Sequence, residues 1–517
     1  MTHKQPGTIL RLLALLLSFL LLAAACGGGD DETTAAEIGD GDDMAETGDS
    51  DSGGDTDSDG DDMAEDESAT GDSDSDGGDM AETEPATGDN DSDGDDMAET
   101  DDSDDGGPEP EPEPRTASWR GVTEDTITVG VSMLNFDLLK ELNLSPAGWG
   151  DQQGVWEALI ADLNAKGGIN GRTVEAVYEF YSPIDPVDAE RVCTALTEDN
   201  ETFAVLGGFV GPLAGTADPC ITGLNETILV GGEINADELE QSRAPWYHTE
   251  PTVESTTENL IGLLVSTGRL TDGMPVYVIA GRAAAATVDG VVEALEARGA
   301  EVVGRSIIEA NDGETLAQNQ QLEVILERFQ ESGAQAIMIN GTPSAAIRGI
   351  GLAGLNGEFP VWTNNPAGLN NLGETITDKS IADGVLTSGG PTDSEIYADP
   401  LYQSACNDVI AAALPEADLR RPTEYGEEEE NWFNPTRRAC RHLALFVEIA
   451  TAAGANLTHE SFKAAADGLS DFVLPGGAAS LSPTKFGARD LFRLAAYDHT
   501  EGDGEAVPVT DLIDIFP

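Results

Sequence analysis

The sequence predicts an α/β protein of two lobes, each built on a doubly wound parallel sheet, with a hinge between them and a disordered acidic linker before them. Short apolar segments rich in β-branched residues alternate with amphipathic helical segments, which is typical of parallel sheets covered on both faces. The alternation is interrupted near Pro251 and then starts again, which indicates two sheets. The folded part, from residue 115 onward, has 403 residues, more than one hydrophobic core usually holds.

The first 25 residues predict an export signal. Lys4 and Arg11 supply positive charge, residues 9–25 are almost entirely apolar, and three alanines precede Cys26, the order found in signal peptides. A cysteine at the cut position resembles the bacterial lipoprotein signal, so we expect residues 1–25 to be removed and Cys26 to carry a lipid anchor. A plain secretory signal or an uncleaved anchor is the alternative. In each case the bulk of the chain works outside the cytoplasm.

Residues 26–114 predict a disordered acidic linker. From residue 27 onward it holds 37 Asp and Glu, no basic residue and no aromatic residue, so it cannot bury enough apolar surface to offset its chain entropy. The tetrapeptide Asp-Met-Ala-Glu recurs four times within it. Segments such as Asp55–Gly60 resemble half of a calcium loop but lack the glutamate expected at position twelve. A solvated spacer is therefore favoured over a calcium fold, and calcium binding stays open.

The first run of alternating elements spans residues 126–230. Apolar strands are expected at 126–131, 174–180, 203–206 and 227–230. Trp156, Leu159, Ile160 and Leu163 recur at helical spacing. A glycine pair then ends that helix.

The second run begins after Pro251 and is followed by a third block. The second run predicts strands at 275–280, 301–308, 336–339 and 360–363, with helices through 288–295 and 322–329. The third block predicts a strand at 384–388, a helix through 443–450, and a terminal hairpin of 491–497 and 506–515.

Four cysteines remain when Cys26 is set aside, and three pairings are possible. Cys193 precedes the third strand and Cys220 follows it, while Cys406 and Cys440 flank an acidic loop. Outside the cytoplasm we therefore expect the pairs Cys193–Cys220 and Cys406–Cys440. Free buried thiols are the alternative.

The turn after the first helix, Gly167–Arg172, reads Gly-Gly-Ile-Asn-Gly-Arg and resembles the type I periplasmic binding proteins of the Leu/Ile/Val-binding branch. The glycine-rich turn Gly207–Pro212, the segment Tyr247–Thr249 and the late turn Pro475–Gly477 are similar to that family in the same order. The resemblance covers about residues 124–517. It implies discontinuous lobes, with lobe one at about 124–247 and 384–480 and lobe two at about 252–380 and 485–517.

The resemblance implies a monomeric binding protein that captures a small solute between its lobes, closes like a hinge and presents the solute to an ABC permease. It implies no cofactor and no enzymatic activity. The same fold also serves ligand sensors that signal to a membrane receptor, which is the alternative function. A permease and an ATPase encoded beside this chain would favour import.

Loops after the strands are the expected ligand contacts, because ligands bind beyond the carboxyl ends of parallel strands. The candidates are Phe136, Trp149, Gly208, Phe209, Val210, Gly232 and Glu233 from lobe one, and Arg282, Asn340, Thr342 and Asn364 from lobe two. Amino-acid binders of the family carry a hydroxyl in the turn after the third strand and an acid in lobe two. Here the turn lacks a hydroxyl and the region 340–344 is neutral. Branched-chain amino acids are therefore disfavoured, and a neutral or acidic solute, an amide or a urea-like ligand stays open, unless Glu233 or Asp289 supplies the charge.

Other function classes are disfavoured. The net charge is −73, and such a field repels nucleic acid and anionic lipid headgroups. The sequence contains no phosphate-binding GxxxxGK[ST] motif, no HExxH and no GxSxG, and its five histidines are scattered. An enzyme is therefore not expected.

Overall fold

The computed structural model describes residues 114–516 apart from 212, 253, 312, 373–375, 427 and 503. The predictions of an export signal, of a lipidated Cys26 and of a disordered linker at 26–114 lie outside the described residues, apart from the linker's last residue. Among the residues described, no helix combines the length and apolarity that a membrane crossing requires.

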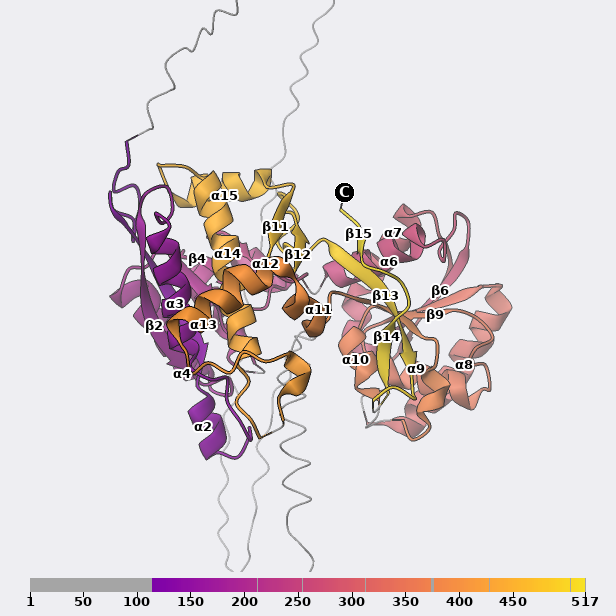
Figure 1. Ribbon diagram of the computed structural model, residues 1–517. Coiled ribbons are helices and arrows are strands. Elements are labelled where there is room, and N and C mark those ends of the chain that lie inside the picture. Colours follow the sequence, from indigo (N-terminus) through magenta and orange to yellow (C-terminus); the bar gives the residue numbers. More distant parts are fainter. Residues whose placement is uncertain are drawn as a thin grey trace, which may run out of the picture. The chain divides into compact units, whose positions relative to one another are not determined.

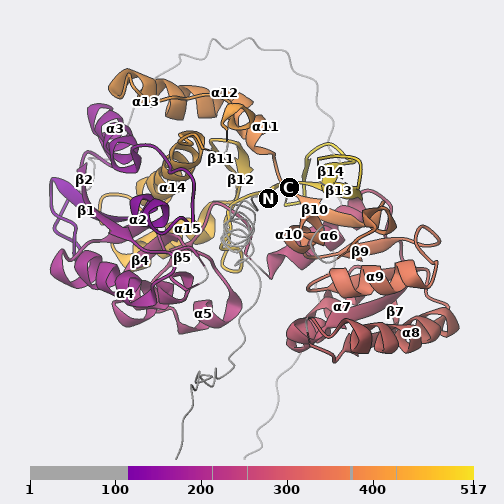
Figure 2. The ribbon, with the colours of Figure 1, turned by 90° about the horizontal axis from the view of Figure 1, so that it is seen from below.

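The first sheet is parallel and has the strand order β2-β1-β3-β4-β5. Its strands are β1 (Thr126–Leu134), β2 (Thr173–Tyr181), β3 (Ala204–Gly207), β4 (Ile228–Gly231) and β5 (Trp246–Tyr247). Its helices include α2 (Phe136–Glu141), α3 (Gln152–Ala165), α4 (Pro186–Thr194), α5 (Ala236–Gln241), α11 (Asp393–Ala398), α12 (Pro400–Tyr402), α13 (Asp408–Ala413), α14 (Phe433–Ala452) and α15 (His459–Gly468). Figures 1 and 2 show α3 and α14 beside its strands, although α14 comes almost 300 residues later.

Strands β3 and β4 of the first sheet are buried along their whole length, which explains their uniformly apolar sequences. The edge strand β2 is partly exposed and carries Glu175 and Glu179. Ala204 and Leu206 of β3 pack with α3, α14 and α15, whereas Val205 between them packs with α4. The alternation has the period of two that an extended strand imposes. The strands predicted for this lobe are therefore confirmed.

The second sheet is mixed, in the order β14-β13-β10-β9-β8-β6-β7, with β15 paired to β13. Its strands are β6 (Pro275–Gly281), β7 (Glu301–Ile308), β8 (Ala336–Asn340), β9 (Val361–Thr363), β10 (Leu386–Gly389), β13 (Leu491–Asp498), β14 (Glu505–Pro508) and β15 (Ile513–Asp514). Strands β6 to β10 are parallel to one another, and β13 to β15 form the antiparallel edge. Helices α6 (Ser255–Ser266), α7 (Val288–Ala297), α8 (Thr315–Ser332), α9 (Ser344–Leu352) and α10 (Pro366–Asn370) accompany it.

One expected boundary is wrong. Residues from 384 were expected to return to lobe one, but Leu386–Gly389 pairs with β9 and β13 inside the second sheet. The yellow β13 and β14 lie next to this strand in Figure 2. A short apolar strand could pair in either sheet, because its sequence pattern does not identify its partner strand. The return to the first lobe begins instead with α11 at Asp393.

Two further segments connect the two sheets. Residues 248–254 follow β5, and residues 480–490 follow the small hairpin of β11 (Phe472–Leu474) and β12 (Gly477–Ala479). The two connections touch, because the backbone N–H of His248 donates to Phe486 O at 2.9 Å and that of Ala488 donates to His248 O at 2.8 Å. Residues 485–490, expected in lobe two, therefore belong to a connection.

Both predicted disulfides are present. Cys193 and Cys220 lie 6.3 Å apart between Cα atoms, and Cys406 and Cys440 lie 5.7 Å apart. The second disulfide ties the turn Gln403–Asn407 to α14 within the core of the first lobe.

We expect the double variant Cys406→Ala/Cys440→Ala to lose about 4 kcal/mol of unfolding free energy, because its bridge closes a loop of 34 residues in the unfolded chain. Urea unfolding of the full chain followed by circular dichroism measures this. A loss below about 1 kcal/mol would show that the bridge does not constrain the unfolded chain.

Candidate functional site

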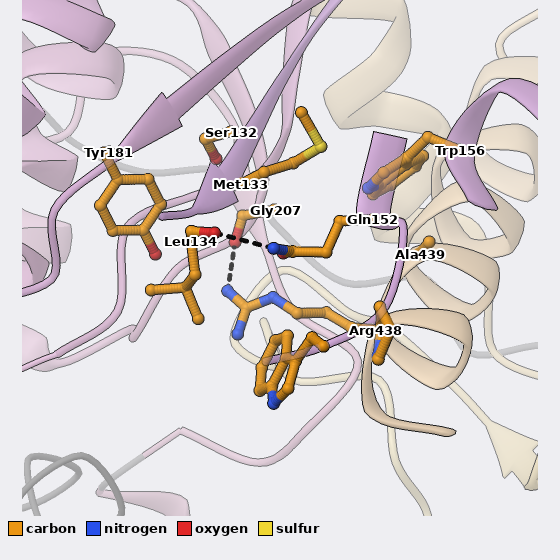
Figure 3. Close-up of a pocket in the computed structure, with 11 residues that line it drawn as sticks. Ser132, Met133, Leu134, Gln152, Trp156, Tyr181, Gly207, Arg438 and Ala439 are labelled. Carbon is orange, nitrogen blue, oxygen red and sulfur yellow. Dashed lines mark hydrogen bonds between the residues drawn. The ribbon is translucent and has the colours of Figure 1, made fainter. Parts of the chain in front are cut away.

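The candidate site lies at the carboxyl ends of β1, β2 and β3, where ligands of doubly wound sheets bind. A small pocket there has a cavity of about 20 Å³, enough for one water molecule. It is lined by Ser132, Met133, Leu134, Trp149, Gln152, Trp156, Tyr181, Gly207, Pro435, Arg438 and Ala439. Figure 3 shows these side chains converging from the strand ends, from α3 and from α14.

Arg438 provides the positive charge of this pocket. Its Nη2 donates to the backbone oxygen of Gly207 at 2.8 Å, the contact drawn in Figure 3. Among the described residues, Arg438 forms no ion pair, in contrast to Arg437 and Arg441 on the same helix. A half-buried guanidinium with spare N–H donors and no carboxylate is suited to receive an anion.

Two glycine turns bring the backbone close to this arginine. Gly207 and Gly208 after β3, and Gly231 and Gly232 after β4, all have positive φ. A Cβ on Gly208 would lie 2.3 Å from the backbone nitrogen of Gly232, so the two turns pack more closely than any side chain permits.

Asp218 fastens the same two turns together. Its fully buried carboxylate accepts the backbone N–H of Phe209 at 2.8 Å and that of Glu233 at 3.2 Å. Burial raises the pKa of Asp218 well above its usual value, and these two donors act in the opposite direction. Asp218 is thus a positioning residue for the loops.

Glu233 adds a titratable carboxyl after β4. Burial raises its pKa to about 7, the positive charge of Arg438 opposes the rise, and Glu238 adds to it. Its charge therefore changes near neutral pH, within the electrostatic reach of Arg438.

Three polar groups near the pocket are already used by the protein. The hydroxyl of Ser132 donates to Gly208 O at 2.7 Å, and Gln152 Nε2 donates to Leu134 O at 2.7 Å. The backbone N–H of Val210 donates to the Tyr181 hydroxyl at 2.9 Å. They fix the strand ends and leave Arg438 as the charged group free for a ligand.

The predicted lobe-one residues divide into three groups. Trp149 lines the pocket, and Phe136 packs on it with ring centroids 4.9 Å apart. Phe209 is fully buried and packs edge-on against Tyr181 at 4.9 Å, so its side chain belongs to the core. Gly208, Val210, Gly232 and Glu233 form the turns described above.

The predicted lobe-two residues collect at the carboxyl ends of β6, β8 and β9. Asn340 Nδ2 donates to Ala284 O and to Thr287 Oγ1, both at 3.0 Å, and Asn364 Nδ2 donates to Asn340 Oδ1 at 2.8 Å. These two asparagines therefore bind one another and the local loops. Arg282 is exposed and donates to Asn311 Oδ1 at 3.0 Å, and Thr342 is exposed.

Sequence reasoning did not identify Arg438 or Asp218. A signal for Arg438 exists: Arg437, Arg438 and Arg441 fall within five residues of a chain with only 25 Lys and Arg. No comparable signal marks Asp218 among 98 acidic residues.

A group of side chains that could hold a metal ion lies elsewhere in the described part of the chain. Asp383, Asp498 and His499 place ligand atoms within 4.8 Å of one another. His499 Nδ1 and Asp383 Oδ2 are already hydrogen-bonded at 2.7 Å, and both residues are exposed. The cluster lies on the second sheet, apart from the pocket of Arg438.

Residues 150–500 match the model of a protein family described as periplasmic binding protein. No curated protein matches the chain. Among solved structures, a putative branched-chain amino acid ABC transporter from Rhodospirillum rubrum has 15% identity and a TM-score of 0.49, with 74% of this chain and 99% of that one covered. A fatty acid ABC transporter substrate-binding protein from Thermomonospora curvata has 17% identity and a TM-score of 0.41, with coverages of 77% and 95%.

We expect Asp218→Ala to lower the free energy of unfolding by about 2 kcal/mol, because two buried backbone N–H groups lose their acceptor. Asp511→Ala, an exposed site, is the matched control and should change stability by less than about 0.5 kcal/mol. Urea unfolding of both variants measures the difference. Equal stabilities would show that the turns do not depend on Asp218.

Proposed function

The chain belongs to the periplasmic binding protein family, and we propose that it captures a small polar solute carrying a carboxylate and delivers it to an ABC importer. The observation that carries the proposal is Arg438, which lies at the carboxyl ends of the parallel strands and has no ion pair with any residue that the structure describes. In this environment a guanidinium binds a carboxylate through two parallel hydrogen bonds.

The neighbours of Arg438 support a ligand with an apolar part. Trp149, Trp156 and Met133 line the same pocket, and aromatic faces pack well on flat or aliphatic groups. The resulting class is a small organic acid with an apolar body.

The second lobe supports a ligand without an ammonium group. The segment from the last residue of β8, Asn340, to Ser344 includes no acid. Asn340 and Asn364 direct their amides to one another and to local groups. A ligand ammonium would be left without a paired charge there, which is costly in a closed site. Of the two acids that could accept it, Asp289 is paired with Arg305, so Glu233 is the better candidate.

Capture requires that the two lobes approach over the ligand. A pocket of about 20 Å³ on one lobe is too small to enclose a solute by itself, so we propose that groups from the second lobe complete the site on closure. Closure then follows from the better binding of the solute to the closed state.

Delivery follows from the N-terminal features. A lipidated Cys26 would hold the protein at the outer face of a membrane, and the linker 26–114 would let the monomeric binding domain reach a permease. A receptor-coupled sensor of the same fold would bind the same solute without supporting uptake, so uptake by cells carrying the partner permease separates the two functions.

The first test is a thermal-shift screen of the full chain against aliphatic and aromatic carboxylates, the corresponding amides, and amino acids. A ligand at 100 times its dissociation constant should stabilise the protein by about 2.7 kcal/mol. We expect carboxylates to stabilise it, and Arg438→Met to weaken binding by about 100-fold, because a buried carboxylate loses its charged partner.

Arg437→Met is the matched control for this substitution. Arg437 is the preceding residue of α14 and pairs with Asp393 at 3.3 Å instead of lining the pocket. It should leave the affinity within about threefold of the unchanged protein, the scatter expected for a charge outside the site. Equal losses in both variants, or amides binding as tightly as carboxylates, would contradict the carboxylate role of Arg438.

Affinity for the carboxylate should also fall as pH rises from 6 to 8. Glu233, whose pKa burial raises to about 7, becomes negative over this range and repels a bound anion. Isothermal titration at pH 6, 7 and 8 should show this fall, and Glu233→Gln should flatten it. An affinity that rises with pH would indicate instead a ligand ammonium paired with Glu233.

A further inference from the structure

A larger cavity lies beside the segments that connect the two sheets. Its volume is about 220 Å³, which exceeds the roughly 150 Å³ of an engineered cavity that binds benzene. The lining residues come from the connection after β5, the start of α6, the connection 480–490, strand β13 and the segment after β15: Pro251, Thr252, Ser255, Glu258, Asn259, Ser482, Thr484, Lys485, Phe486, Gly487, Arg489, Phe492 and Phe516. It shares no residue with the pocket of Arg438.

Asn259 places an unused polar group in this cavity. The residue is only 1% exposed, and its Oδ1 has no hydrogen-bond partner among the described residues. A buried carboxamide oxygen without a donor costs about 1–3 kcal/mol. Asn259 Oδ1 is one of fifteen buried side-chain N and O atoms without a partner in the described part of the chain, and it belongs to a residue that lines the cavity.

The charged side chains that line the cavity differ in how many hydrogen bonds and ion pairs they form. Lys485 uses all three of its N–H donors, on Ser480 O at 2.6 Å, Ala488 O at 3.1 Å and Asp490 Oδ1 at 2.7 Å. Arg489 pairs with Glu250 through Nη2, while its buried Nε has no hydrogen-bond partner among the described residues. Glu258 is exposed at the cavity and forms no ion pair among the described residues. The groups without a partner among the described residues are therefore the acceptors of Asn259 and Glu258 and one N–H of Arg489. The two acceptors suit a ligand that donates N–H.

The apolar part of the lining fits a ring. Phe486, Phe492 and Phe516 contribute to the wall, and Phe492 and Phe516 lie 6.4 Å apart in an edge-on arrangement. Aromatic walls of this kind pack against a flat apolar body.

We propose that this cavity is a second ligand site, which takes a small molecule with an N–H donor on a ring-sized apolar body and binds that donor through Asn259 Oδ1. A primary amide and an amine share this chemistry, and Glu258 favours the amine. The proposal is independent of the solute site, because the two pockets have no residue in common.

Fluorine NMR of the full chain tests it with 4-fluorobenzamide, 4-fluorobenzylamine and 4-fluorobenzoate as probes. The benzamide, the benzylamine or both should bind, and Asn259→Leu should weaken that binding at least tenfold while Arg438→Met leaves it unchanged. The benzoate, which lacks an N–H donor, should bind less tightly here. Any benzoate binding that Arg438→Met removes belongs to the solute site.

Two further variants control the experiment. Asn356→Leu makes the same chemical change at an exposed turn and should have no effect. Thr484→Trp, on the exposed rim, should block the cavity if Asn259→Leu fails to fold. The proposal is overturned if neither N–H probe binds, if the folded Asn259→Leu or Thr484→Trp variant binds them as tightly as the unchanged protein, or if the benzoate binds equally well at this cavity.

Discussion

The carboxylate of Glu250 is the interaction on which the arrangement of the connecting segments depends. It lies in the connection after β5 and pairs with Arg441 of α14 and with Arg489 of the connection before β13. The side chains of Arg441 and Arg489 are only 7% and 13% exposed. Two buried guanidiniums without this carboxylate would repel one another, and loss of one partner of such a pair costs about 3–5 kcal/mol.

The protonation states of Glu250 and of two nearby histidines keep the charges of this network balanced at neutral pH. Burial raises the pKa of Glu250, but the charges of Arg489, Arg441 and Arg437 outweigh it and hold the pKa well below its usual value. The ion pairs of Glu250 therefore stabilise the folded protein at every pH above the ordinary pKa of a glutamate, and this stabilisation is lost only in strong acid. Burial lowers the pKa of His248 to about 4, and His442, whose ring centroid lies 5.3 Å away, is lowered in the same way, so neither adds a positive charge at neutral pH.

Helix α14 links this network to the solute site. It carries Arg441 at the connection, Cys440 in a disulfide and Arg438 in the pocket, all within four residues. Positions three apart on a helix share a face, and a helix held by both an ion pair and a disulfide presents its neighbouring side chains with little freedom. The direction of Arg438 is thus a consequence of contacts made for structural reasons, which is how a binding site is preorganised.

The same geometry explains what the sequence predicted and what it did not. Period-two and helical patterns identified the strands from Thr126 to Val361, apart from the two-residue β5, and the second half of α14, because burial leaves a local signature. They did not place Leu386–Gly389, because pairing partners are chosen by tertiary contacts. Arg438 was missed for a related reason: it reaches the end of β3 from 231 residues away, and Asn340 and Asn364 followed the expected strands but bind each other. An acidic solute would be repelled at long range by the negative charge of this chain. Physiological salt screens charges beyond roughly 8 Å, so selection of the solute depends on its contact with the guanidinium of Arg438.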